Sequence, residues 1–80
     1  MDGYRMILAS EMGKRDGMLV EIRTTDPVRR IAEVFEDDET GELTFTSFVT
    51  EGVPLEAIED LLALAHKEFP SPHLLEPDKT

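Results

Sequence analysis

The sequence predicts an α+β fold, in which a four-stranded antiparallel β-meander of two consecutive hairpins carries one C-terminal amphipathic helix packed on one face. Three observations support this fold class: apolar alternation on both sides of residues 38–41, a similar pair of runs around residues 13–17, and a helical apolar period after Pro54. A period of two is typical of half-buried strands, and a period of 3.6 indicates an amphipathic helix. Because strands joined by short turns usually pair, the four strands should be neighbours in chain order.

The first hairpin is expected to join strands at residues 4–12 and 18–24. The segment between them, GKRDG, has two glycines and ends on an Asp-Gly pair, which favours a tight reversal. In the second strand Met18, Val20 and Ile22 share one face, while the other face carries Leu19, Glu21 and Arg23. Pro27 lacks an amide hydrogen, so the chain should turn there into the second hairpin.

The central hairpin, residues 30–50, is the most strongly patterned stretch. A loop formed by residues 39–41 would place Phe35 opposite Phe45 and Glu33 opposite Ser47. Side chains alternate along a strand, so this register divides the hairpin into a core face and an outer face. The predicted core face carries Ile31, Phe35, Leu43, Phe45 and Val49. The predicted outer face carries Ala32, Val34, Glu36, Thr44, Thr46 and Phe48.

The helix is expected to run from about Pro54 to Phe69, because proline suits the first helical turn and Pro70 and Pro72 end it. At 100° per residue the helix has a single apolar stripe, formed by Leu55, Ile58, Leu61, Leu62, Ala65 and Phe69. With the strand residues Met6, Leu8, Val20 and Ile22, this stripe and the core face of the hairpin complete the predicted core. Residues 1–70 are therefore expected to form a single domain, and residues 71–80 a flexible C-terminal tail.

Composition restricts the possible partners. The chain has 80 residues, no cysteine, and 18 acidic against 8 basic residues, which gives a net charge of −10. This charge opposes binding to nucleic acid phosphates or anionic membranes and favours a soluble protein or a basic partner. Without cysteine, an export signal or a long apolar segment, the protein is expected to be cytoplasmic.

Sites for catalysis, cofactors or metal ions are not expected. The acidic segment at residues 36–42 resembles a calcium loop only in composition, because Ser47 stands where the loop would need a glutamate. His66 and His73 have no carboxylate at metal-binding spacing, and no serine lies in a nucleophile motif. An enzyme that uses carboxylates is the weakest hypothesis, with Glu33 as its test position because the register places it among apolar residues.

The predicted function is therefore non-catalytic, and acts through protein–protein interaction or self-association, with a homodimer as one possibility. The alternative is an acidic inhibitor, of the kind found among immunity proteins, that masks a basic site on its target. Association of such an inhibitor should weaken with added salt, whereas an apolar dimer should resist salt. The candidate interaction surface consists of Ala32, Val34, Thr44, Thr46, Phe48 and Leu64.

Overall fold

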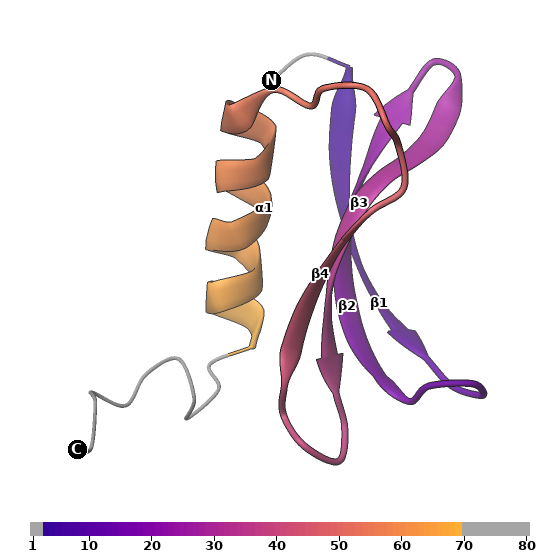
Figure 1. Ribbon diagram of the computed structural model, residues 1–80, viewed down its shortest axis with the longest axis vertical. Coiled ribbons are helices and arrows are strands. Elements are labelled where there is room, and N and C mark those ends of the chain that lie inside the picture. Colours follow the sequence, from indigo (N-terminus) through magenta and orange to yellow (C-terminus); the bar gives the residue numbers. More distant parts are fainter. Residues whose placement is uncertain (1–2, 70–80) are drawn as a thin grey trace.

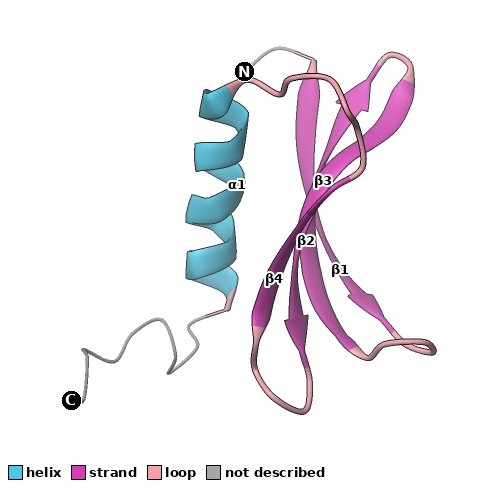
Figure 2. Cartoon of the chain, viewed as in Figure 1, coloured by secondary structure: helices cyan, strands magenta, loops and turns pink. Residues whose placement is uncertain are grey.

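Residues 3–69 are described by the computed structural model, and they form one antiparallel sheet and one helix (Figure 1). The elements are β1 (Tyr4–Glu11), β2 (Gly17–Thr25), β3 (Val28–Asp37), β4 (Leu43–Ser47) and α1 (Leu55–Glu68). The strand order is β1-β2-β3-β4, and α1 lies on one side of the sheet as a second layer (Figure 2). The predicted α+β meander with a C-terminal helix is confirmed. The predicted tail at residues 71–80 lies outside the described residues.

The predicted register of the β3–β4 hairpin is wrong by one residue. Phe45 pairs with Val34, and Phe35 pairs with Thr44. The loop has four residues rather than three, because the amide of Asp37 donates to the carbonyl oxygen of Glu42 at 3.0 Å and so closes the ladder one residue earlier. A slip of one residue moves every side chain of one strand to the other face relative to its partner. Side chains of β3 and β4 that were predicted to share a face therefore lie on opposite faces of the sheet.

The turn itself explains why the longer loop is favoured. The carboxylate of Asp37 accepts hydrogen bonds from the amides of Glu39 at 2.8 Å and Thr40 at 3.0 Å. Gly41 has a φ of 73°, a conformation that glycine adopts without strain, and its amide donates to the carbonyl oxygen of Asp37 at 2.8 Å. The acidic segment is therefore a hydrogen-bonded turn, in which a carboxylate satisfies backbone amides.

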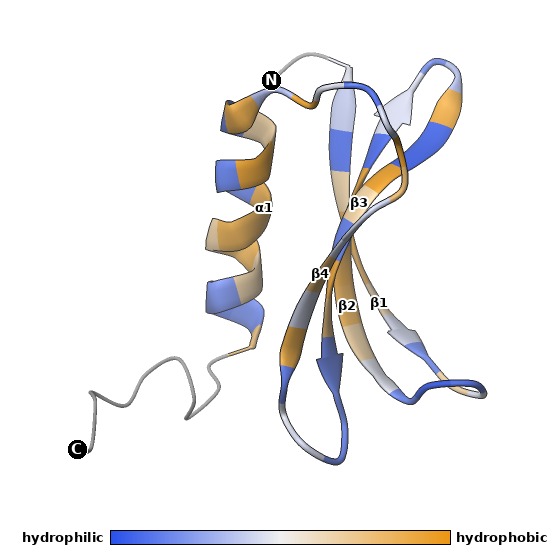
Figure 3. Ribbon diagram, in the orientation of Figure 1, coloured by the Kyte–Doolittle hydropathy of each residue, from blue (hydrophilic) through white to orange (hydrophobic). Residues whose placement is uncertain are grey.

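The core lies between α1 and the middle of the sheet, where apolar positions of the helix and strands meet (Figure 3). Its buried residues are Val20, Ile22, Ile31, Ala32, Val34, Ala57, Leu61, Ala65 and Phe69. The helix is turned relative to the predicted stripe, since Ala57 is buried whereas Leu55 is 70% exposed. Alanines at 57 and 65 let the helix approach the sheet closely, and Leu64, predicted outside the stripe, packs against the core.

The helix packs mainly against β2 and β3 and leaves the edge strands less covered. Leu8 on β1 and Phe45 on β4, both predicted core residues, are 47% and 49% exposed. Phe35 is buried, but it lies on the side of the sheet away from α1, opposite Thr44. One helix cannot cover four strands, so apolar surface remains on the helix side of both edges.

Gly17 begins β2 at a place where no side chain fits. A Cβ atom there would lie 2.7 Å from Cζ of Phe35 and closer still to the carbonyl oxygen of Glu36, a backbone atom that cannot move aside. Substitution Gly17→Ala is therefore expected to lower the free energy of unfolding by about 2 kcal/mol, measured by urea denaturation. Gly52→Ala is the control, because nothing lies within 4 Å of that position. Equal stability of Gly17→Ala and Gly52→Ala would contradict the conclusion that no side chain fits at Gly17.

Candidate functional site

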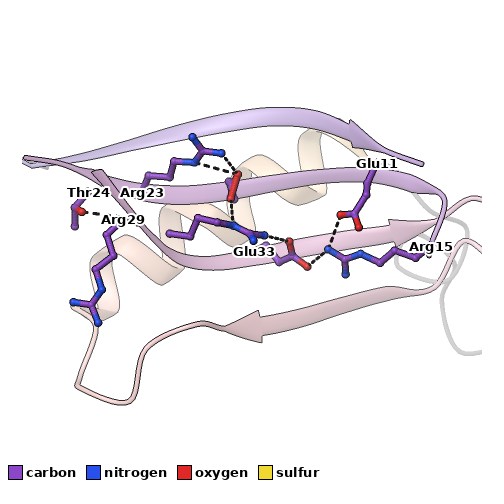
Figure 4. A network of polar contacts seen from close by, with 8 residues as sticks. Glu11, Arg15, Arg23, Thr24, Arg29 and Glu33 are labelled. Carbon is purple, nitrogen blue, oxygen red and sulfur yellow. Dashed lines mark hydrogen bonds and ion pairs between the residues drawn. The ribbon is translucent and has the colours of Figure 1, made fainter. Parts of the chain in front are cut away.

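The face of the sheet away from α1, which we call the open face, carries two buried carboxylates. It is formed by side chains of Leu19, Glu21, Glu33, Phe35 and Thr44. Glu21 on β2 pairs with Glu33 on β3, and they are only 3% and 1% exposed. Two adjacent buried carboxylates need compensating cations, because desolvation of an unpaired charge is very costly. Three arginine side chains supply that compensation (Figure 4).

Two arginines hold the carboxylate of Glu21. Arg23 donates to Oε1 through Nε at 3.2 Å and Nη2 at 2.8 Å, and Arg30 donates to Oε2 through Nε at 2.9 Å. Both oxygens therefore have a guanidinium partner, and such charge-assisted bonds are roughly twice as strong as neutral ones.

Glu33 is held by two arginines from different elements. Nη2 of Arg30 donates to Oε1 at 3.1 Å, so this one guanidinium links Glu33 with Glu21. Nη2 of Arg15, in the first turn, lies 2.6 Å from Oε2 of Glu33 and 2.9 Å from Oε1 of Glu11. The network thus joins β1, β2, β3 and the β1–β2 turn across the open face.

A β-bulge in β3 brings Arg30 into this network. Ile22 pairs with Ala32, but the next residue, Arg23, pairs with Arg30, so Ile31 is an extra residue. The bulge lets Ile31 join the core beneath α1 while Arg30 projects onto the open face. Strict alternation had placed Ile31 correctly in the core, but it contains no signal for a bulge and therefore could not predict the arginine network.

Two aromatic rings support the arginines. The guanidinium carbon of Arg15 lies 4.1 Å from the ring centroid of Phe35, and that of Arg30 lies 4.1 Å from the centroid of Phe48. A guanidinium that lies over an aromatic ring in this way gains a cation–π attraction. Arginine side chains therefore cover the open face, in place of a second layer of secondary structure.

The network predicts a stability that depends on pH. Burial by itself raises the pKa of Glu21, but hydrogen bonds from Arg23 and Arg30 outweigh it and hold the pKa below the ordinary 4.5. The unfolded chain therefore takes up this proton at higher pH than the folded protein does. Its contribution to stability is present above about pH 4.5 and is lost as the pH falls through the folded-state pKa.

This dependence is measured by thermal unfolding between pH 7 and pH 3. Wild-type protein is expected to lose stability below about pH 4.5, and Glu21→Gln, which has no titrating group there, should show a shallower decline. An unchanged slope in the variant would assign the acid sensitivity to other carboxylates.

The fold separates the six residues of the candidate interaction surface into two groups. Ala32 and Val34 lie in the core beneath α1, because the one-residue slip separates them from the outward residues of β4. Leu64 packs against the same core. The remaining three positions are exposed, and these are Thr44, Thr46 and Phe48. Phe48 is 40% exposed beside Arg30, and a contact role for it stays a prediction.

Sequence reasoning missed an apolar hollow on the helix side, which we call the α1–β4 groove. Its lining residues are Val34, Leu43, Thr44, Phe45, Leu62, Ala65 and His66. Leu62 is 39% exposed and faces this hollow together with the half-exposed Phe45. The groove exists because α1 lies over β2 and β3 and leaves β4 partly uncovered. The correct register would have revealed it, since Val34 then pairs with Phe45 on the helix side of the sheet.

Acidic side chains lie beside both walls of the groove. Glu36 pairs with Leu43 and so shares its face of the sheet, and Glu59 is exposed one helical turn before Leu62. None of the lining residues is lysine or arginine. The groove thus combines an apolar floor with a negative border.

Metal binding has no geometric support among residues 3–69, where no cluster of three or more histidine, cysteine, aspartate or glutamate side chains could hold an ion. The turn carboxylate of Asp37 is occupied by amides of Thr40 and Glu39, and these hydrogen bonds lower its pKa. His66 lines the α1–β4 groove, and His73 lies outside the described residues.

Comparisons with protein-family models, curated proteins and solved structures found no match for this chain. Within residues 3–69, no helix has the length and apolar character needed to cross a membrane.

Proposed function

We propose that this protein is a non-catalytic binding protein whose contact with another protein is centred on the α1–β4 groove. The observation that carries the proposal is the pair of half-exposed apolar side chains, Phe45 and Leu62, around one apolar hollow. Aromatic and aliphatic side chains that border a pocket are common centres of protein interfaces, because a partner side chain buried there excludes water.

The charge of the chain supports an inhibitor-like or masking role toward a basic target. A net charge of −10 speeds encounter with a positively charged surface and disfavours acidic partners. Most arginines are held within ion pairs, those of the open face with Glu11, Glu21 and Glu33, and Arg29 with Glu51. On the helix side, α1 itself carries four acidic residues, Glu56, Glu59, Asp60 and Glu68, against one lysine, Lys67.

Self-association is the second candidate, favoured by Phe48 on the exposed part of the open face. Two copies that met through this face would avoid the acidic border of the groove. Such a contact would depend less on salt than a groove contact, because the arginines of this face are already paired with Glu21 and Glu33.

The two candidates are separated by affinity capture of the tagged protein from lysate of its source cells at low and high salt. A stoichiometric basic partner is expected at low salt, with strong loss at high salt and in the variant Leu62→Gln. Leu8→Gln is the matched control, because Leu8 is exposed to a similar extent and lies on β1, at the other edge of the sheet from β4. Capture that is unchanged by Leu62→Gln would refute a groove-centred function, and recovery of only a salt-resistant homodimer would favour self-association.

A further inference from the structure

We infer that the α1–β4 groove receives a basic segment of a partner protein, which inserts one apolar side chain between Phe45 and Leu62. This inference deepens the proposed function and rests on it. It specifies both the size of the anchoring group and the charge of the residues beside it.

The volume of the hollow sets the size of the anchor. It is about 140 Å³, close to the roughly 150 Å³ of an apolar cavity that takes up benzene. One phenylalanine or leucine side chain therefore fits, whereas the apolar face of a whole helix does not. The floor, formed by Val34, Leu43 and Ala65, offers no charged group to such a side chain.

The border sets the charge of the flanking residues. Glu36 at the sheet wall and Glu59 at the helix wall lie on two sides of the apolar floor. At 100° per residue, Lys67, the one lysine of α1, lies on a different side of the helix from Leu62. Lysine or arginine residues on both sides of the anchor would therefore meet opposite charge on each wall.

The same charges argue against two other occupants. A second copy of the chain would bring one acidic border against another, and like charges placed together disfavour association. Residues 70–80 of the chain contain Leu74 and Leu75, but also two acidic residues and only one basic residue. A basic partner segment fits the acidic border better than either.

The test uses three synthetic peptides and the full-length protein labelled with ¹⁵N. The first peptide has one phenylalanine between pairs of lysines, the second replaces phenylalanine with serine, and the third replaces the lysines with glutamates. Only the first is expected to shift the amide resonances of groove residues in a saturable manner. Its affinity should fall about tenfold or more with Leu62→Gln or Phe45→Ser, and remain unchanged with Leu8→Gln.

The charged border has its own test. A Glu36→Gln, Glu59→Gln double variant is expected to bind the first peptide several-fold more weakly and with less dependence on salt. Spectra of each variant without peptide establish that it is folded. Equal binding of the serine peptide would overturn the apolar anchor, and equal binding of the glutamate peptide would overturn the basic flanks.

Two further outcomes would overturn the assignment of the occupant. Groove resonances that shift with protein concentration alone would identify a second copy, and resonances that shift in a Leu74→Ser, Leu75→Ser variant without peptide would identify the chain's own C-terminal residues. This inference can fail while the proposed function stands. If capture from lysate still depends on Leu62 while the peptides do not bind, the groove binds a partner of different chemistry.

Discussion

Substitution of Arg30 by methionine is expected to lower the free energy of unfolding by about 3 kcal/mol, because it leaves two buried carboxylates with reduced compensation. Arg30 bonds both Glu21 and Glu33, and its guanidinium also lies over the ring of Phe48. Methionine keeps much of the aliphatic length but none of the charge. The midpoint and slope of urea denaturation would measure the loss.

The adjacent Arg29 supplies the control. It pairs with Glu51 at 2.7 Å, but both side chains are more than half exposed, and exposed ion pairs contribute at most about 1 kcal/mol. Arg29→Met should therefore change stability little, and Arg30→Lys should fall between the two because lysine keeps the charge without the planar fork. A similar loss for Arg29→Met and Arg30→Met would show that the network does not stabilise the fold.

Substitution Leu61→Ala is expected to lower the free energy of unfolding by about 3–4 kcal/mol. Leu61 is fully buried at the centre of α1, where it packs with Ala57, Ala65 and the apolar residues of β2 and β3. Its replacement by alanine removes apolar burial and leaves a cavity, since alanines on either side cannot fill the space. Thermal or urea unfolding with circular dichroism would measure the change.

Leu55→Ala is the matched control on the same helix. Leu55 is 70% exposed although it belongs to the predicted apolar stripe, so its truncation is expected to change stability by no more than about 0.5 kcal/mol. Equal losses at the two positions would mean that the helix is rotated toward the stripe predicted from periodicity, with Leu55 in the core.

The strand and helix assignments were accessible from sequence because they depend on local chemistry. Turn residues at 13–17 and 38–41, and prolines at 27, 54 and 70, separate segments with clear periods of two or 3.6. Short connections then leave a meander as the simplest topology. The central register failed because it depended on whether the loop contained three or four residues, and Asp37 favours the longer loop through hydrogen bonds to amides.

The candidate site was harder to predict from the sequence, because it too depends on the register. Ala32 and Val34 were predicted on an outer surface, and the slip in register places them beneath α1. Glu33 was expected to face inward beside apolar residues. It is buried, but on the open face, where Arg15 and Arg30 pair with it. Alternation does not place either arginine on the same face as Glu33. Arg15 lies in the β1–β2 turn, and Arg30 reaches the open face only because of the bulge beside it.

By itself the sequence determined the number and order of the elements, the negative charge and the amphipathic nature of the helix, since each depends on residues close together in the chain. Only the tertiary structure decided which face of each strand is covered, which arginines neutralise the buried carboxylates, and where β4 and α1 leave an apolar groove. Those features depend on a one-residue register, a single bulge and the rotation of one helix. Each is selected by the packing of segments distant in sequence, so no local pattern encodes them.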